Sequence, residues 1–154
     1  MDLSSLLGSD AVKIMHAVSS KKRLFQDLAE MAHDCYGYDS TRVLEALMDR
    51  ESLGPTGVGN GVALPHARVN GCDKIHGVFL RIEKPVDFGS VDRLPVDLIF
   101  ALFAPEPSNV EHLKALALVS RTMRDKSVCA KLRANADPAT LHAILTEGPA
   151  SQAA

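Results

Sequence analysis

Apolar residues along this chain follow two different periods, and each period predicts a different element. Alternation of apolar and polar residues predicts strands at 12–18 and 77–83, whereas residues 1–10 show no clear period and are expected to be irregular. The run at 96–104 is almost wholly apolar apart from Asp97, which is typical of a strand covered on both faces. The pattern therefore predicts a sheet with at least one fully buried strand.

Elsewhere apolar residues recur every three or four positions, which is the spacing of one face of a helix. Capping residues and glycine stops divide these stretches into five helices. With their caps, the helices are expected at 19–37, 39–51, 108–123, 126–133 and 137–147. The third begins with Ser108-x-x-Glu111, a capping box, which places His112 in its first full turn.

Strands and helices intermix along the chain, so the pattern predicts an α/β fold in which helices cover a mixed sheet. The length of 154 residues suits one domain with a sizeable core. Residues 149–154 are mostly small and are expected to form a disordered tail.

The composition is that of an ordinary soluble globular protein, with 46% apolar and 23% charged residues. A formal net charge of −2 gives no electrostatic reason to expect a nucleic acid or an anionic membrane as partner. No signal peptide is expected at the start, and the apolar run at 98–104 is too short to span a bilayer. Three scattered cysteines without a C-x-x-C pair indicate reduced thiols and a cytoplasmic protein.

The most distinctive stretch, residues 54–68, combines four glycines within eight positions with a short apolar run and a Pro-His pair. Glycine allows a positive φ, and successive main-chain N–H groups in such a loop can form a concave anion site. The loop is not a P-loop, since no Gly-Lys-Ser/Thr follows, and it precedes the predicted strand at 62–64, unlike a dinucleotide fingerprint. A flexible connection and an anion-binding loop both remain open on composition.

Two residues that bracket this loop, Arg50 and His66, favour a functional role. Pro65 stiffens the backbone before His66, which helps an imidazole to present one nitrogen repeatedly. His112 lies at a predicted helix N-terminus, where free N–H groups and the helix dipole favour anions. These groups could together surround a phosphate, although His66 alone is equally compatible with a surface histidine.

Other chemistries find less support in the sequence. A metal site built from His66, His112 and Asp97 is conceivable, but no pair of histidines has metal-ligand spacing and H-E-x-x-H is absent. A serine hydrolase would need a G-x-S-x-G elbow, which the chain lacks. No metal and no other cofactor is therefore expected.

Three segments, 50–66, 95–102 and 111–117, resemble in the same order the IIA domains of the fructose/mannitol type of the phosphotransferase system. The resemblance depends on an arginine, G-x-G-N-G, a Pro-His pair and a downstream His-Leu, and it extends over nearly the whole chain. Within this family the chain is most similar to the nitrogen-related branch, the stand-alone regulatory IIA proteins. Pro55 stands where a serine is common, and Ala67 where a glycine is common.

The resemblance implies a single domain at 1–148 with a central mixed sheet of about five strands, flanked by helices on both faces. It implies that His66 accepts a phosphoryl group from a histidine of an HPr-like carrier, with Arg50 and His112 beside that phosphate. A glycine loop at 57–61 would also let Asn60 and the backbone approach this phosphate, and the residues expected to bind it there are Gly59, Asn60 and Gly61.

The expected function is that of a phosphocarrier, a phosphohistidine phosphotransferase that signals its phosphorylation state by binding regulatory target proteins. Three alternatives stay open, and the third, a metal hydrolase, would depend on the metal site considered above. A sugar-transport IIA would pass the phosphate to a separate IIB domain. A non-catalytic binding module would keep the fold and have no phosphorylated form.

Overall fold

The structure, a computed structural model, describes residues 1–71, 73–107 and 110–147. The predicted capping box includes residues 108 and 109, and the predicted tail at 149–154 follows the last described residue, so both lie outside the described ranges. None of the helices in these ranges combines the length and the apolar character that a bilayer crossing requires.

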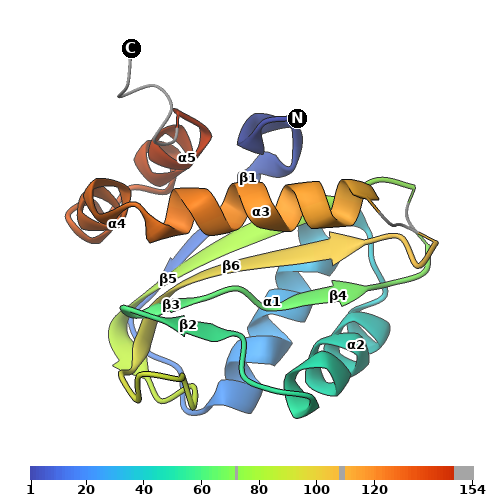
Figure 1. The fold of residues 1–154 in the computed structure, drawn as a ribbon, viewed down its shortest axis with the longest axis horizontal. Coiled ribbons are helices and arrows are strands. Elements are labelled where there is room, and N and C mark those ends of the chain that lie inside the picture. The colour runs from blue at the N-terminus through green and yellow to red at the C-terminus, as the bar shows by residue number, and fades with distance from the viewer. Residues whose placement is uncertain (72, 108–109, 148–154) are drawn as a thin grey trace.

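In the described part of the chain, six strands form one central sheet (Figure 1). They are β1 (Leu7–Met15), β2 (Gly57–Gly59), β3 (Val62–Ala63), β4 (His66–Arg68), β5 (His76–Val86) and β6 (Val96–Ala104). The order β1-β5-β6-β3-β2 places β5 and β6 in the middle, and β4 also pairs with β6. Because β5 and β6 are antiparallel while β3 and β4 are parallel to β6, the sheet is mixed, as predicted.

Helices cover both faces of this sheet (Figure 1). Those of the described ranges are α1 (Lys21–Tyr36), α2 (Ser40–Ser52), α3 (Val110–Arg124), α4 (Lys126–Arg133) and α5 (Pro138–Glu147), after a 3-10 turn, Leu3–Ser5. α1 runs behind the sheet and packs against α2, whereas α3 crosses in front of it. The predicted α/β fold with helices on both faces is confirmed.

The first two helices begin and end where the sequence predicts. The hydroxyl of Ser20 accepts the N–H of Arg23 at 3.1 Å, and the carboxylate of Asp39 accepts the N–H of Thr41 at 3.0 Å, so both residues are N-caps. Gly37 ends α1 with a φ of 80°, a conformation in which only glycine is unstrained. These caps place the C-terminal end of α2 directly before the glycine-rich stretch.

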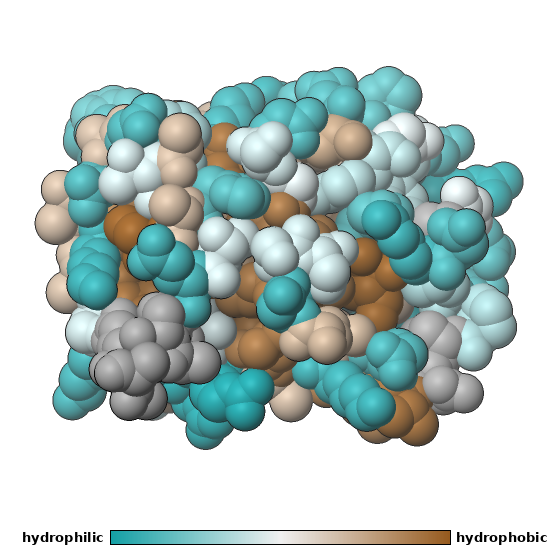
Figure 2. Space-filling model, turned by 90° about the horizontal axis from the view of Figure 1, so that it is seen from above, coloured by the Kyte–Doolittle hydropathy of each residue, from teal (hydrophilic) through white to brown (hydrophobic). Residues whose placement is uncertain are grey.

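The two central strands form the core. Every side chain of β6 except Asp97 is buried, as expected for a strand covered on both faces. The rings of Phe79 and Phe100 meet across β5 and β6 at 6.2 Å, and Phe25 of α1 meets Phe88 edge to face at 5.6 Å. Seen from the side of α3, polar residues dominate the surface and apolar residues show between them in separate areas (Figure 2).

Residues 1–10 were expected to be irregular, and this prediction is wrong. β1 begins at Leu7, which pairs with Gly77 of β5, and the register shifts between Leu7 and Val12. The N–H of Gly8 donates to the hydroxyl of Tyr36 at 2.9 Å. Pairing with β5 and the Tyr36 contact extend the strand through polar residues that show no apolar alternation.

Two further strands do not appear in the hydrophobic pattern. Gly57–Gly59, expected to be part of a loop, forms β2 and pairs antiparallel with β3. His66–Arg68 forms β4, whose partner is β6. Both segments are three residues long, so only their partners in the sheet define them as strands.

Candidate functional site

His66 is held at the start of β4 by its own backbone. Its Nδ1 lies 2.9 Å from the carbonyl oxygen of Leu64, and a carbonyl can only accept, so Nδ1 carries the proton. The N–H of Leu64 donates to the carbonyl of Thr56 at 2.9 Å, and the carbonyl of Pro65 accepts the N–H of Leu102 at 3.0 Å. The ring is therefore fixed in the tautomer that leaves a lone pair on Nε2.

Arg50 lies in the last turn of α2, and its guanidinium points toward Nε2 of His66. Its Nε donates to Nε2 of His66 at 3.3 Å, and its Nη1 donates to the carbonyl of Gly54 at 3.0 Å. Since Nε is a donor, Nε2 of His66 must be the acceptor, in agreement with the tautomer fixed by Leu64. The guanidinium thus lies beside the one ring nitrogen that is free to act as a nucleophile.

His112 lies in the first turn of α3 and brings a second imidazole to the site. The ring centroids of His66 and His112 are 5.8 Å apart, with their planes at 48°. His112 is 6% exposed, and its Nδ1 is buried without a hydrogen-bond partner among the residues that the structure describes. The structure therefore brings together the three side chains expected to surround a phosphate.

The environment favours the uncharged form of both imidazoles, because it lowers the pKa of each. Burial is the main cause that lowers the pKa of His66 below its usual value, and the charge of Arg50 lowers it further, while the hydrogen bond to Leu64 opposes them. Burial also lowers the pKa of His112, with smaller contributions from His66 and Arg68. At neutral pH an uncharged His66 has a nucleophilic nitrogen available.

Glu51, next to Arg50 in the sequence, fixes the start of the glycine-rich stretch. Its carboxylate accepts the N–H of Thr56 at 3.0 Å and the hydroxyl of Thr56 at 2.6 Å, and it pairs with Lys21 of α1 at 2.7 Å. Lys21 also donates to the carbonyl of Phe88 at 2.8 Å. Sequence reasoning missed this network, because three segments distant in the sequence meet in it.

His66 and Arg50 line two neighbouring cavities. The larger cavity has a volume of about 660 Å³, and it is also lined by His112 and by one side of α2. The smaller, of about 210 Å³, is mainly apolar, and its further lining residues are Pro55, Thr56, Val58, Leu64, Leu116 and Ser120. His66 and Arg50 therefore both line cavities that open to solvent.

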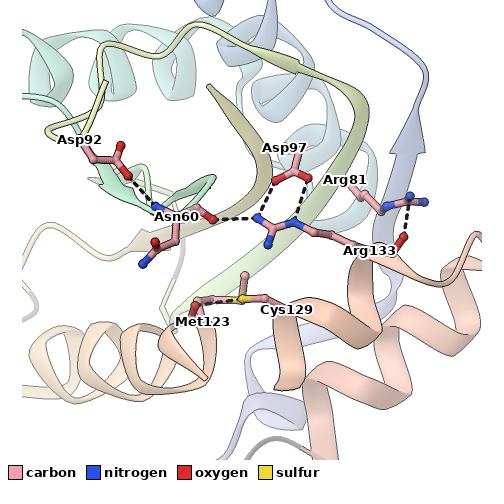
Figure 3. A network of polar contacts seen from close by, with 7 residues as sticks. All are labelled: Asn60, Arg81, Asp92, Asp97, Met123, Cys129 and Arg133. Carbon is pink, nitrogen blue, oxygen red and sulfur yellow. Dashed lines mark hydrogen bonds and ion pairs between the residues drawn. The ribbon is translucent and has the colours of Figure 1, made fainter. Parts of the chain in front are cut away.

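The structure does not bring Gly59, Asn60 and Gly61 to this site. They form the turn between β2 and β3, where the N–H of Asn60 donates to Asp92 at 2.9 Å and its carbonyl accepts from Arg133 at 2.8 Å (Figure 3). They line a different hollow, one that contains neither His66 nor His112.

The strand register explains this separation. Val62, just after the turn, pairs with Leu98 of β6, whereas His66 pairs with Leu102. Four residues of extended chain span about 13 Å, so the turn and the imidazole lie far apart along β6. The phosphate-binding residues predicted in the turn are thus placed away from the histidine pair.

Asp97, considered as a metal ligand with the two histidines, is also placed elsewhere. It forms a two-point ion pair with Arg133 of α4, at 2.8 and 2.9 Å (Figure 3). Among the described residues no group of three histidine, cysteine, aspartate or glutamate side chains could hold a metal ion. Asp97 thus supports the β2–β3 turn from the same end of β6.

The chain thus has a mixed sheet on which one histidine lies beside a guanidinium and a second histidine. This arrangement is suited to small proteins that hold an anionic group on an imidazole. The chain belongs to the family described as phosphoenolpyruvate-dependent sugar phosphotransferase system, EIIA 2, whose model matches residues 5–148. The resemblance seen in the sequence motifs is confirmed.

Similar proteins include nitrogen regulatory proteins. That of Bradyrhizobium diazoefficiens is 42% identical over 153 residues, which are 99% of this chain and 100% of the relative. The crystal structure of the nitrogen regulatory protein IIA-Ntr from Neisseria meningitidis has a TM-score of 0.87 at 35% identity, covering 94% of this chain and 99% of that one. The mannitol IIA of Escherichia coli, at 22% identity, shares the fold with a TM-score of 0.74 and covers 90% and 97% of the two chains.

Proposed function

We propose that this protein is a phosphocarrier of the nitrogen-related phosphotransferase system that accepts a phosphoryl group on Nε2 of His66. The donor is a phosphohistidine of an HPr-like carrier protein, and the phosphorylation state is read by regulatory target proteins in the cytoplasm. One observation carries the proposal: Leu64 holds the proton on Nδ1 of His66 while Arg50 lies at Nε2.

In the proposed step, the lone pair on Nε2 of His66 attacks the phosphorus of the donor. The bond between phosphorus and the donor's ring nitrogen breaks, and its electron pair returns to that nitrogen. The donor ring, protonated at its other nitrogen, leaves as a neutral imidazole, and its positive charge passes to the His66 ring, which now bears both the Nδ1 proton and the phosphoryl group. The proton on Nδ1 stays hydrogen-bonded to the carbonyl of Leu64, so the phosphorylated ring keeps a fixed orientation. Arg50 must release its bond to Nε2 in this step, which leaves its guanidinium beside the incoming phosphoryl oxygens.

The rest of the site supports this step through charge and position. Phosphoryl transfer passes through a loose transition state, so catalysis depends mainly on alignment and on stabilising negative charge. Arg50 supplies a permanent positive charge, and His112 can donate one hydrogen bond from its ring. Exposed apolar side chains close to these residues suit a protein partner, and they are Leu53, Val58 and Leu113.

The experiment is incubation with the phosphorylated carrier, followed by intact mass measurement and mapping of the acid-labile phosphate. One phosphoryl group is expected on the wild type and none on His66→Ala. His16→Ala is the control, since His16 is exposed and pairs only with Glu83 in the described structure. A phosphoryl group that persists in His66→Ala would contradict the assignment, and no phosphorylated wild type would favour the non-catalytic binding module.

Sugar transport is the second candidate, because the relatives also include sugar-specific proteins. The fructose-specific EIIA component of Haloferax volcanii is 28% identical over 147 residues. A sugar-transport IIA would pass its phosphate to a IIB domain. Transfer from phosphorylated protein to a purified IIB domain at a rate comparable to uptake from the carrier would favour this candidate over the regulatory one.

A further inference from the structure

A second guanidinium, that of Arg68, lies on the same face of the sheet as His66. Side chains alternate along β4, so His66 and Arg68 share one face while the buried Ala67 takes the other. Positions two residues apart in a strand are separated by about 7 Å. Arg68 and His66 line the larger cavity together with His112.

The side chain of Arg68 has no partner among the residues that the structure describes. Arg50 donates to His66 and Gly54, and Arg133 pairs with Asp97, whereas the guanidinium of Arg68 makes no hydrogen bond or ion pair within the described ranges. An unpaired guanidinium at a cavity wall is available to any negative charge that arrives there.

Arg68 also decides the charge balance of this cavity. The other charged side chains that line it are Arg42, Glu45, Asp49 and Arg50 from α2 and Glu106 from the turn before α3. Without Arg68, the lining thus carries two positive and three negative side chains, a formal charge of −1. The positive charge of Arg68 brings the formal charge of the lining to zero. On α3 itself, Glu111 pairs with Lys114 at 3.7 Å.

This balance matters for both histidines. A net negative cavity would oppose a dianionic phosphoryl group on His66, and it would favour a proton on His112. The charge of Arg68 acts in the opposite direction on His112, where it adds to the effect of burial in lowering the pKa. A neutral His112 keeps one ring nitrogen free to accept and the other free to donate.

Given the function proposed above, we propose that Arg68 is a further residue of the phosphoryl site, whose charge stabilises phosphorylated His66 and keeps His112 uncharged in the free protein. Arg68 acts through the field in the cavity and through His112, so it is a positioning residue rather than a nucleophile or an acid.

The test compares wild type with Arg68→Gln, Arg68→Lys and Arg121→Gln. Arg121 is an exposed arginine of α3 that lines neither cavity, so its substitution changes the net charge equally. Two quantities are measured: the equilibrium constant for phosphoryl transfer from the phosphorylated carrier, and the midpoint of the His112 ring titration by NMR in the unphosphorylated protein. An equilibrium constant is independent of any change in carrier docking.

Arg68→Gln is expected to lower the equilibrium constant about three- to tenfold, the effect of one charge at this range in a partly screened site. It is also expected to raise the His112 midpoint, while Arg68→Lys and Arg121→Gln remain close to wild type. Wild-type values for Arg68→Gln in both measurements, or equal losses in Arg121→Gln, would overturn the inference. If the wild type took no phosphoryl group, the proposed function would be wrong. The His112 titration would then still test whether the charge of Arg68 acts on His112.

Discussion

At the scale of single residues, the chemistry at His66 depends on which ring nitrogen holds the proton. The carbonyl of Leu64 accepts a hydrogen bond from Nδ1, and Arg50 donates to Nε2, the nitrogen that we propose takes the phosphoryl group. Burial keeps the ring uncharged, since it lowers the pKa of His66. In the proposed transfer, the main-chain contact and burial therefore prepare His66 as the nucleophile without a general base.

Substitution of Arg50 tests the contribution of its guanidinium. We expect Arg50→Ala to slow single-turnover transfer by about 10²- to 10³-fold, the usual cost of removing one donor from a developing anion. Arg50→Lys should recover part of this loss, because it keeps the charge but not the two-point geometry. Melting curves serve as the control for folding, and a stable Arg50→Ala variant with wild-type rates would remove this role.

Asp27 of α1 offers a test of a buried charge far from the site. Its side chain is 4% exposed, one carboxylate oxygen has no partner in the described ranges, and burial raises its pKa despite the neighbouring Arg23. Because the pKa of Asp27 is higher in the folded protein than in the unfolded chain, folding favours the protonated carboxyl group. This contribution to stability is fully present below the unfolded-state pKa, and it is lost as the pH rises through the folded-state pKa.

We therefore expect Asp27→Asn to match wild type in acid and to gain stability relative to it as the pH rises to neutrality. Urea unfolding at a series of pH values measures this difference, in which the other titrating groups cancel. A difference between the two proteins that does not change with pH would contradict the prediction.

At the scale of elements, the turn between β2 and β3 contacts the Arg133–Asp97 pair and lies away from His66. Gly61 has a φ of 79°, and a Cβ there would lie 2.5 Å from Nη2 of Arg133 and 2.8 Å from Asp97. The glycine at this position thus allows the Arg133–Asp97 pair to approach the turn. A glycine-rich sequence is equally compatible with close approach by a ligand or by another part of the same chain.

Gly61→Ala should destabilise the protein by roughly 2 kcal/mol or more, because it combines a left-handed backbone with displacement of Arg133. Gly89→Ala is the matched control, since Gly89 has a φ of 70° with nothing within 4 Å of a Cβ. Denaturant unfolding gives both values. Equal losses in the two variants would show that only backbone strain matters at Gly61.

At the scale of the whole molecule, the sheet holds together elements that carry different parts of the site. Arg50 comes from α2, His66 from β4 and His112 from α3, and these helices pack against β4 and β6. The central strands are buried on both sides, whereas β2 is short and lies at the sheet edge. We therefore expect the central strands β5 and β6 to be the most rigid part of the sheet and the β2–β3 hairpin the least rigid.

Hydrogen exchange should report this gradient. The amides of β5 and β6 should exchange only through global unfolding. The amides of β2 should exchange at least about 100-fold faster, because an edge strand can open locally at a lower free-energy cost than a core strand. Exchange followed by NMR measures each amide, and the buried Val78 and Phe100 are suitable reporters. Protection of β2 equal to that of β6 would contradict the prediction.

The sequence by itself determined the α/β class, the buried strand at 96–104, the helix caps and the family, because apolar period and capping residues act over a few neighbouring positions. It also indicated Arg50, His66 and His112 as candidates for one site, since recognisable motifs surround them, and the structure places the three side chains together. Tertiary structure alone decided where β2 and β4 form, because such short strands depend on partners distant in the sequence.

Tertiary structure also decided where the glycine turn and Arg68 lie. Composition made the turn a candidate phosphate cradle, but the parallel register of β3 and β4 on β6 carries it away from His66. The same register brings Arg68 to the cavity of the histidines. Sequence describes what each residue can do, whereas pairing across the sheet determines which residues meet, because register moves a side chain by several ångströms without changing its local pattern.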